Sequence, residues 1–430
     1  MSDIKVGFDI GAIHNSDRPL NIGVIDADLL DNGTRHPNLA LLKISGYCKR
    51  LGHNVRLITT YDDIRETLDY KPNYDILAMS RVFKFTVIPE DIKVLIDQGL
   101  IYIGGTGFFE VNGPNLPDEV EHCMPDYHLY DEYIELKTGG DEKKKKKWSD
   151  YLNFSIGFTT RGCIRQCGFC VNRLLKRVQE WSPVSEFLDK SRPKIYLWDD
   201  NIMAAPPKVF VKVMEDLKST GLPFQFRQGL DIRLMTKAKA ELLSQVKYYG
   251  DYIFAFDHYK MDDPFEKKQV EDTIRGLNIW REYSDKSTKL YVLVAYDGQD
   301  EKDVEGAFFR IKTLMEYGCL PYIMRFEKYN DSKFKDMYIQ LARWCNQPSF
   351  FKKMSFRQFC IRNEEFHQGL NAIYNDGVYR TSLEFPEGFD RKNTFCSCYR
   401  AMIQFEEEFP EIAKEYFDLR FEDLNKYNIK

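Results

Sequence analysis

Residues 154–170 read FSIGFTTRGCIRQCGFC, and this stretch decides the fold. Its first seven residues, FSIGFTT, are typical of a buried β-strand. Three cysteines, Cys163, Cys167 and Cys170, follow at once, and charged neighbours such as Arg165 argue against a core segment of buried cysteines. The pattern therefore predicts a strand that ends in a loop carrying three thiols.

Further β-rich segments follow this strand at regular intervals, with amphipathic helical stretches between them. They are KIYLWDD (194–200), FQFRQGL (224–230), YIFAFD (252–257), KLYVLVAYD (289–297) and LPYIMRFE (320–327). Repeated strand–helix units predict a parallel sheet curved into a partial (βα)6 TIM-type barrel over residues 151–330. Such folds carry their active sites at the carboxyl ends of the strands.

The preceding residues predict a separate α/β domain. Apolar runs at 22–26, 55–59, 75–79 and 100–103 alternate with helical stretches, which is typical of a Rossmann-like parallel sheet over residues 1–136. The lysine-rich segment KTGGDEKKKKKWSD (137–150) is interpreted as a solvated linker. Residues 331–430 have helical spacing and predict a helical C-terminal extension. The expected fold class is thus α/β in three parts.

Charge and hydropathy exclude several classes of partner. The 61 basic and 66 acidic residues leave a formal charge of −5, which gives no general attraction to nucleic acid or to an anionic membrane. No leader-like N-terminus and no apolar run of membrane-spanning length is visible. We therefore expect a cytoplasmic globular protein with no membrane contact.

Three closely spaced cysteines on one loop suit an iron–sulfur cluster, because a [4Fe-4S] cubane with three protein thiolates keeps one iron open for another ligand. A structural zinc site is the main alternative. Such a site takes four ligands, and no fourth Cys or His lies near the motif in the sequence.

The spacing Cys163-x3-Cys167-x2-Cys170, with Phe169 before the last cysteine and a barrel strand before the first, resembles the signature of the radical S-adenosylmethionine (SAM) superfamily. The resemblance covers residues 153–327. It implies an enzyme in which SAM chelates the open iron, and an electron from a flavodoxin- or ferredoxin-type donor cleaves SAM. The resulting 5′-deoxyadenosyl radical abstracts hydrogen from a substrate that the sequence does not identify.

The N-terminal part resembles the cobalamin-binding domain found in one branch of this superfamily, through the segment HPNLALLKISGYCKRLGHNVRLIT, Ser80 and Gly104-Gly105. That branch implies a cobalamin-dependent radical SAM methyltransferase as an alternative. The Asp-x-His-x-x-Gly motif of many cobalamin proteins is absent after residues 22–26. A non-catalytic metal-binding or scaffold protein is a further alternative.

Polar residues at the ends of the later barrel strands are candidates for binding the cofactor. The resemblance implies SAM contacts at these positions: Asp199, Asp200, Arg227, Asp257, Tyr296 and Arg325. For Asp199 and Asp200 a strand-end turn with local hydrogen bonds is the alternative, and for Arg227 an internal Arg–Asp pair is equally compatible. No residue is assigned a catalytic role.

Four cysteines of the last hundred residues, Cys345, Cys360, Cys396 and Cys398, raise the question of an auxiliary cluster. Only Cys396 and Cys398 are close in sequence, and aromatic residues precede three of the four. This context favours packed core cysteines.

Overall fold

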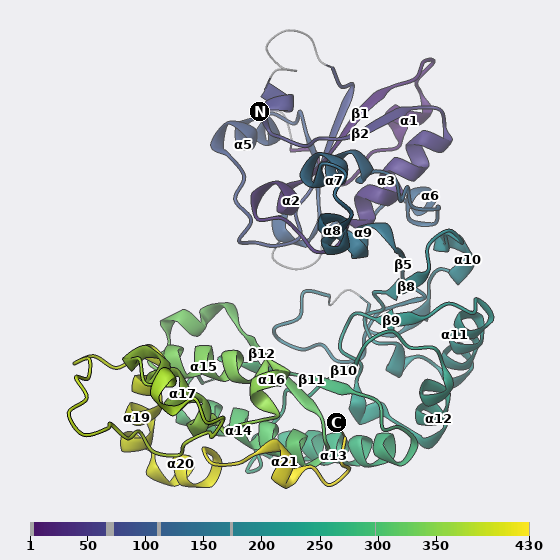
Figure 1. The fold of residues 1–430 in the computed structure, drawn as a ribbon. Coiled ribbons are helices and arrows are strands. Elements are labelled where there is room, and N and C mark those ends of the chain that lie inside the picture. The colour runs from purple at the N-terminus through teal and green to yellow at the C-terminus, as the bar shows by residue number, and fades with distance from the viewer. Residues whose placement is uncertain (1–3, 66–72, 110–112, 173–174, 297, 430) are drawn as a thin grey trace. The chain divides into compact units, whose positions relative to one another are not determined.

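The chain forms two compact units in the computed structural model, Met1–Arg227 and Gln228–Lys430 (Figure 1). The structure describes residues 4–65, 73–109, 113–172, 175–296 and 298–429. The division between the units lies after the third of the predicted barrel strands. It differs from the predicted boundaries at residues 136, 150 and 330, and each unit is described by itself below.

The first unit begins with a parallel sheet whose strand order is β2-β1-β3-β4. Its strands are β1 (Asn21–Asp26), β2 (Asn54–Leu57), β3 (Ile76–Ser80) and β4 (Tyr102–Gly104). Apolar side chains bury the central strands on both faces, as expected for a parallel sheet covered by helices. The predicted N-terminal α/β fold with a parallel sheet is confirmed.

Helices and 3-10 turns surround this sheet. They are α1 (Gly11–His14), α2 (Ala27–Asp31), α3 (Leu39–Arg50), α5 (Glu90–Asp97), η1 (Thr106–Phe108), α6 (Asp118–Glu121) and α7 (Asp131–Thr138). Side-chain caps start two of them: Asp26 at the end of β1 caps α2 by accepting from the Leu29 amide, and Asn38 caps α3 by accepting from the Leu41 amide. The carboxyl edge of β1 is thus fixed by helix capping.

The lysine-rich segment is helical, and Lys143, Lys144, Lys146 and Lys147 are exposed, as expected of a solvated segment. It carries α8 (Glu142–Lys145), η2 (Lys146–Trp148) and the start of α9 (Ser149–Leu152). The Trp148 ring lies 5.7 Å from that of Tyr133 and 5.1 Å from that of Tyr151. Lys145 pairs with Glu135 on α7 at 3.1 Å. The tryptophan anchors a segment whose lysines alone would favour solvent.

A second parallel sheet of the first unit has the order β5-β8-β9. The elements of this region are β5 (Phe154–Gly157), β6 (Thr160–Arg161), β7 (Gln179–Glu180), α10 (Val184–Phe187), β8 (Lys194–Leu197), η3 (Ile202–Ala204), α11 (Pro207–Ser219) and β9 (Phe224–Phe226). Phe154, Ile156 and Tyr196 belong to the same buried cluster as the apolar residues of β1 and α3. The N-terminal fold and this sheet therefore share one core.

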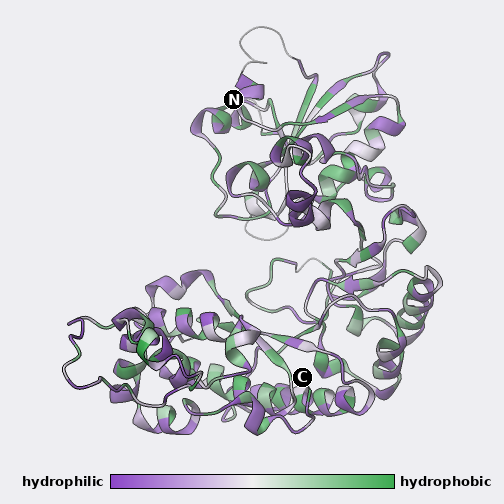
Figure 2. Ribbon diagram, in the orientation of Figure 1, coloured by the Kyte–Doolittle hydropathy of each residue, from purple (hydrophilic) through white to green (hydrophobic). Residues whose placement is uncertain are grey.

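The second unit contains the remaining predicted strands, paired in parallel in the order β10-β11-β12. Its first part comprises η4 (Ile232–Leu234), α12 (Lys237–Gln245), β10 (Tyr252–Ala255), α13 (Pro264–Tyr283), β11 (Thr288–Val294), α14 (Glu301–Glu316), β12 (Leu320–Arg325) and η5 (Glu327–Asp331). Figure 2 shows apolar and polar residues alternating along the turns of α11 and α13. Trp280 of α13 is fully buried against Phe254 of β10, with ring centroids 5.7 Å apart.

The last hundred residues carry helices in the described part of the chain. They are α15 (Lys335–Cys345), α16 (Pro348–Phe351), α17 (Phe356–Gln368), α18 (Asn371–Tyr374), α19 (Ser397–Glu408), α20 (Pro410–Tyr416) and α21 (Phe421–Leu424). Phe308 of α14 packs against Phe356 and Phe417, so aromatic rings join these helices to the sheet-covering helix α14. Among the described helices, none has the length and apolar character needed to cross a membrane.

Burial makes Asp26 a source of pH-dependent stability. The side chain is 2% exposed, and this burial raises its pKa to about 6, although the Tyr130 hydroxyl and the Leu29 amide donate to it. Because the folded-state pKa exceeds the unfolded value of 3.8, the protonated carboxyl stabilises the fold below about pH 4, and this contribution is lost as the pH rises to about 6.

We expect Asp26→Asn to remove this pH dependence. The wild-type free energy of unfolding should lose up to about 3 kcal/mol between pH 4 and pH 7 through this group, and the variant should lose correspondingly less. Urea denaturation at several pH values measures the difference. Exposed Asp262→Asn is the matched control, and equal pH profiles for all three proteins would contradict the assignment.

Candidate functional site

The three motif cysteines lie on a loop that leaves the carboxyl end of β5 through the short strand β6. All three are partly exposed. The Cys163 amide donates to the Leu175 carbonyl at 3.0 Å, and the Cys170 amide donates to the Cys167 carbonyl at 3.1 Å. Gly162 precedes them with a φ of +99°, and a Cβ there would meet the Arg177 carbonyl oxygen at 2.1 Å. Only glycine fits this close approach.

Asp200 fixes both ends of this cysteine loop. Its Oδ2 accepts from the Gly162 amide at 2.7 Å, and its Oδ1 accepts from Asn172 Nδ2 at 3.0 Å. Arg161 Nε lies 3.5 Å from Oδ2, and the Asp200 side chain is only 7% exposed. A single carboxylate thus closes the loop just before the first cysteine and just after the last.

Asp199 holds the preceding strand rather than the loop. Its carboxylate is buried and accepts from the amides and hydroxyls of Thr159 and Thr160 at 2.6–3.0 Å. Burial raises the pKa of Asp199, although these hydrogen bonds act in the opposite direction. The sequence placed Asp199 and Asp200 among cofactor contacts, and the structure gives both carboxylates partners within the protein.

Asn201 is a site residue that the sequence analysis did not single out. Its Nδ2 donates to Cys163 Sγ at 3.3 Å, and the side chain is 4% exposed. Among the described residues its Oδ1 is buried without a hydrogen-bond partner. An amide with a free acceptor beside a thiol loop is compatible with a polar group bound at that loop.

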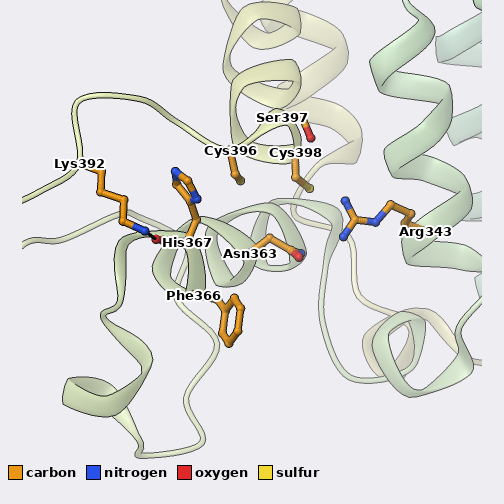
Figure 3. Close-up of a pocket in the computed structure, with 8 residues that line it drawn as sticks. All are labelled: Arg343, Asn363, Phe366, His367, Lys392, Cys396, Ser397 and Cys398. Carbon is orange, nitrogen blue, oxygen red and sulfur yellow. Dashed lines mark hydrogen bonds between the residues drawn. The ribbon is translucent and has the colours of Figure 1, made fainter.

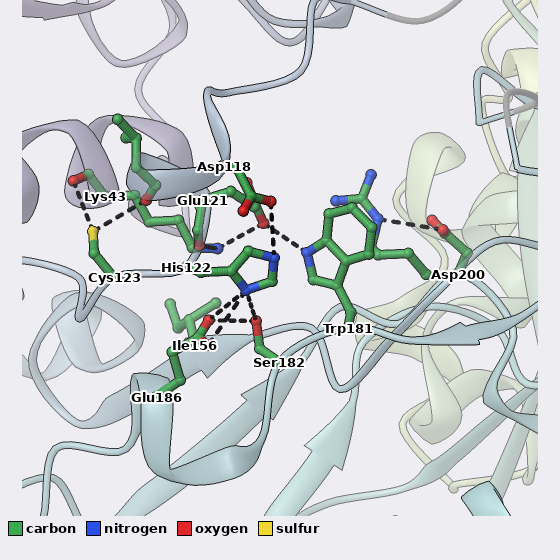
Figure 4. A network of polar contacts seen from close by, with 12 residues as sticks. Lys43, Asp118, Glu121, His122, Cys123, Ile156, Trp181, Ser182, Glu186 and Asp200 are labelled. Atoms are coloured by element: carbon green, nitrogen blue, oxygen red, sulfur yellow. Dashed lines mark hydrogen bonds and ion pairs between the residues drawn. The ribbon is translucent and has the colours of Figure 1, made fainter. Parts of the chain in front are cut away.

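A polar chain connects the cysteine loop to the N-terminal fold (Figure 4). Lys43 Nζ, 3% exposed, pairs with Glu121 Oε1 at 2.7 Å, and Trp181 Nε1 donates to the same oxygen at 2.9 Å. The guanidinium of Arg161 lies 5.5 Å from the Trp181 ring, and its Nε faces Asp200. Contacts between neighbouring side chains therefore connect Asp200, which holds the cysteine loop, to Lys43 on α3.

Arg227 follows β9 and contacts the N-terminal fold as well. Its Nη2 donates to His36 Nε2 at 2.8 Å, and its Nη1 donates to Gln225 Oε1 at 3.1 Å. The carboxyl ends of β5, β8 and β9 thus bring together the cysteine loop, the three residues 199–201 and Arg227 at one edge of a parallel sheet.

The other predicted cofactor residues lie at the strand ends of the second unit. Asp257 follows β10, where burial raises its pKa despite the nearby Arg310 and Arg233. Tyr296 is 40% exposed and packs edge-on against Phe326 at 4.9 Å. Arg325 ends β12 and stacks on Tyr329 at 4.4 Å. These side chains share one sheet edge, and Asp297 lies outside the described residues.

A strained backbone position at this edge was not visible in the sequence. Ala295 has a φ of +61°, which is unfavourable for a residue with a Cβ. Its amide donates to buried Asp303 at 2.7 Å, and the Tyr338 hydroxyl donates to the same Asp303 oxygen at 2.7 Å. The Asp303–Tyr338 pair thereby fixes the turn that carries Tyr296.

The C-terminal cysteines are partly brought together in the second unit. Cys360 Sγ and Cys398 Sγ lie 3.4 Å apart, and Cys396 and Cys398 line a cavity of about 350 Å³ beside Arg343 and His367 (Figure 3). Burial raises the pKa of the Cys360 thiol and, to about 12, that of the Cys396 thiol. Both side chains thus stay protonated at neutral pH in this environment.

Metal-ligating side chains are not preassembled in the described part of the chain. There, no three or more Cys, His, Asp or Glu side chains lie close enough to hold a metal ion. This applies to the motif cysteines and to the C-terminal cysteines alike. Binding by the motif would require its three sulfurs to converge within their loop.

The Asp200 anchor should govern the exposure of the cysteine loop. Asp200→Asn keeps an acceptor for Gly162 but loses the acceptor for Asn172 and the ion pair with Arg161, a cost of about 1–2 kcal/mol. We expect iodoacetamide to label Cys163, Cys167 and Cys170 about tenfold faster in the metal-free variant, as read by peptide mass spectrometry. Buried Cys345 provides the internal reference and exposed Glu215→Gln the matched variant. Unchanged labelling rates would refute the anchoring role.

Comparison with known proteins leaves the family of this chain unassigned. No protein-family model matches the chain, and no curated protein matches it. Among solved structures, the aspartate transcarbamoylase of Trypanosoma cruzi, in complex with carbamoyl aspartate and phosphate, aligns over 67% of this chain and 84% of its own. The identity is 13% and the TM-score 0.17, so this similarity supports no conclusion about fold or function.

Proposed function

We propose that this protein is a radical SAM enzyme that binds a [4Fe-4S] cluster through Cys163, Cys167 and Cys170. The observation that carries the proposal is the position of this thiol loop. It leaves a parallel β-strand at the carboxyl edge of its sheet, and Asp200 holds both its ends. Partly exposed thiols on a short loop are the ligands that iron–sulfur clusters use.

The residues around the loop fit such a group. Asn201 presents a donor to Cys163 Sγ and a buried acceptor without a partner, and hydrogen bonds to cluster sulfurs tune the cluster's potential. When bound, the cluster with SAM supplies reductive sulfonium cleavage and a hydrogen-abstracting radical. The chain itself orients the thiols through Gly162 and Asp200.

The proposal extends to the fold and to the remaining strand-end residues. We infer that β5-β8-β9 and β10-β11-β12 are the two halves of one partial (βα)6 barrel, because each sheet is parallel and helices connect successive strands. Asp257, Tyr296 and Arg325 lie at or just after the carboxyl ends of β10, β11 and β12, where such a fold carries its ligand contacts. Tyr296 and Arg325 are exposed, as ligand contacts require.

Anaerobic reconstitution with iron and sulfide tests the proposal. We expect wild-type protein to bind about four irons per chain, and Cys163→Ala, Cys167→Ala or Cys170→Ala to bind less than about one. Cys396→Ala is the matched control, because it removes a half-exposed thiol outside the motif. Iron binding equal to wild type in the three motif variants would exclude the proposed cluster site.

The reconstituted protein also tests the activity. With SAM and dithionite, wild type should release 5′-deoxyadenosine, detected by chromatography, and the motif variants should not. Cluster-loaded protein that never forms this product would support the alternative of a non-catalytic metal-binding protein. Incubation with hydroxocobalamin, followed by gel filtration and a visible spectrum, tests the cobalamin-dependent methyltransferase, for which a retained corrinoid is required.

A further inference from the structure

His36 connects two charged side chains that lie far apart in the sequence. It belongs to the segment between α2 and α3. Its Nε2 lies 2.8 Å from Arg227 Nη2, which follows β9, and its Nδ1 lies 2.8 Å from Asp150 Oδ2 on α9. The imidazole is therefore flanked by partners of opposite charge, with a hydrogen bond from Arg227 at Nε2 and the Asp150 carboxylate close to Nδ1.

The chemistry of the partners fixes the position of the imidazole proton. A guanidinium has five N–H donors and no acceptor, so His36 Nε2 must carry the lone pair that Arg227 approaches. The proton then lies on Nδ1, which is 2.8 Å from Asp150 Oδ2 but outside hydrogen-bond geometry with it. Burial acts to raise the pKa of Asp150, but the nearby His36 ring and the charge of Arg227 outweigh it and keep this pKa below its usual value.

The Arg227 guanidinium is oriented from several sides. Its carbon lies 4.6 Å from the Tyr196 ring, and Gln225 accepts from Nη1. The rings of Tyr196 and Trp198 meet the His36 ring nearly at right angles, at 6.2 and 6.3 Å. The described contacts use one hydrogen on each terminal nitrogen, and the remaining donors suit a two-point contact with an oxyanion.

We propose that His36 is a positioning residue that presents Arg227 to an oxyanion of the substrate, either a carboxylate or a phosphate. The Arg227 amide donates to the Leu197 carbonyl at the end of β8, 2.8 Å away, so Arg227 lies at the sheet edge that carries the thiol loop. The N-terminal fold thereby contributes to substrate selection through one histidine. Oxyanion binding by Arg227 does not depend on the proposed function. Only the reaction of the bound substrate rests on it.

Two substitutions separate the two contacts of His36. Glutamine reaches the position of Nε2 and offers an acceptor to Arg227, whereas asparagine reaches only the position of Nδ1 and keeps the contact with Asp150. His36→Gln should therefore preserve the orientation of Arg227, and His36→Asn should lose it. His128→Gln is the matched control, because His128 is 76% exposed.

The experiment uses metal-free protein labelled with ¹⁵N-histidine. We expect the His36 ring signals, assigned by their loss in His36→Gln, to show the tautomer protonated on Nδ1. Inorganic phosphate and acetate are then titrated, with binding followed by calorimetry. The preferred probe should bind wild type and His36→Gln alike, and about tenfold more weakly to His36→Asn and Arg227→Gln. Preference for phosphate indicates a phosphorylated substrate, and preference for acetate a carboxylate.

A His36 ring protonated on Nε2, absence of binding by either probe, or equal affinity in His36→Asn would overturn the proposal. Melting temperatures of all variants separate this result from misfolding: a purely structural His36 would lower the melting temperature of His36→Asn without changing probe affinity. No step requires iron or SAM. Failure of cluster binding would therefore refute the proposed function but not the oxyanion site. Failure of oxyanion binding would refute the oxyanion site but not the proposed function.

Discussion

The carboxylate of Asp200 is the interaction on which the arrangement of the first unit's functional edge depends. It joins the residue before the first motif cysteine to a residue just after the last, so the thiol loop is closed by two hydrogen bonds to one buried group. Asp199 fixes the strand that leads into the loop, through two threonines. The two adjacent carboxylates therefore have different roles: Asp199 fixes the strand and Asp200 fixes the loop. Neither needs a cofactor to account for its position.

Contacts with the N-terminal fold extend this arrangement beyond the sheet. Arg161 turns one face to Asp200 and another to Trp181, and Trp181 shares the Glu121 carboxylate with buried Lys43. Arg227 reaches the same fold through His36. Two separate polar chains thus connect the strand ends to helices outside the sheet.

Much of the secondary structure could be predicted because strand and helix periodicity is local. The strands at 22–26, 154–160 and 289–297 match β1, β5 with β6, and β11. In the lysine-rich segment most lysines are exposed, as their charge suggested, but the packing of Trp148 against two tyrosines was not foreseen. Asn201, His36 and the strained Ala295 were assigned no role, because their roles depend on contacts between residues distant in sequence. The spacing of the three cysteines required no such contacts, and its assignment to a cluster stays a prediction.

The core that the N-terminal fold shares with β5 and β8 limits how the chain can be divided. Phe154, Ile156 and Tyr196 are almost fully buried, and they pack with residues of β1 and α3. A chain truncated before Tyr151 would expose this aromatic face to water, at a cost of roughly 1.5–3 kcal/mol for each large side chain. The N-terminal fold therefore supplies part of the hydrophobic core of the first unit. A protease that removed it would leave a remnant with exposed apolar surface, which we expect to aggregate.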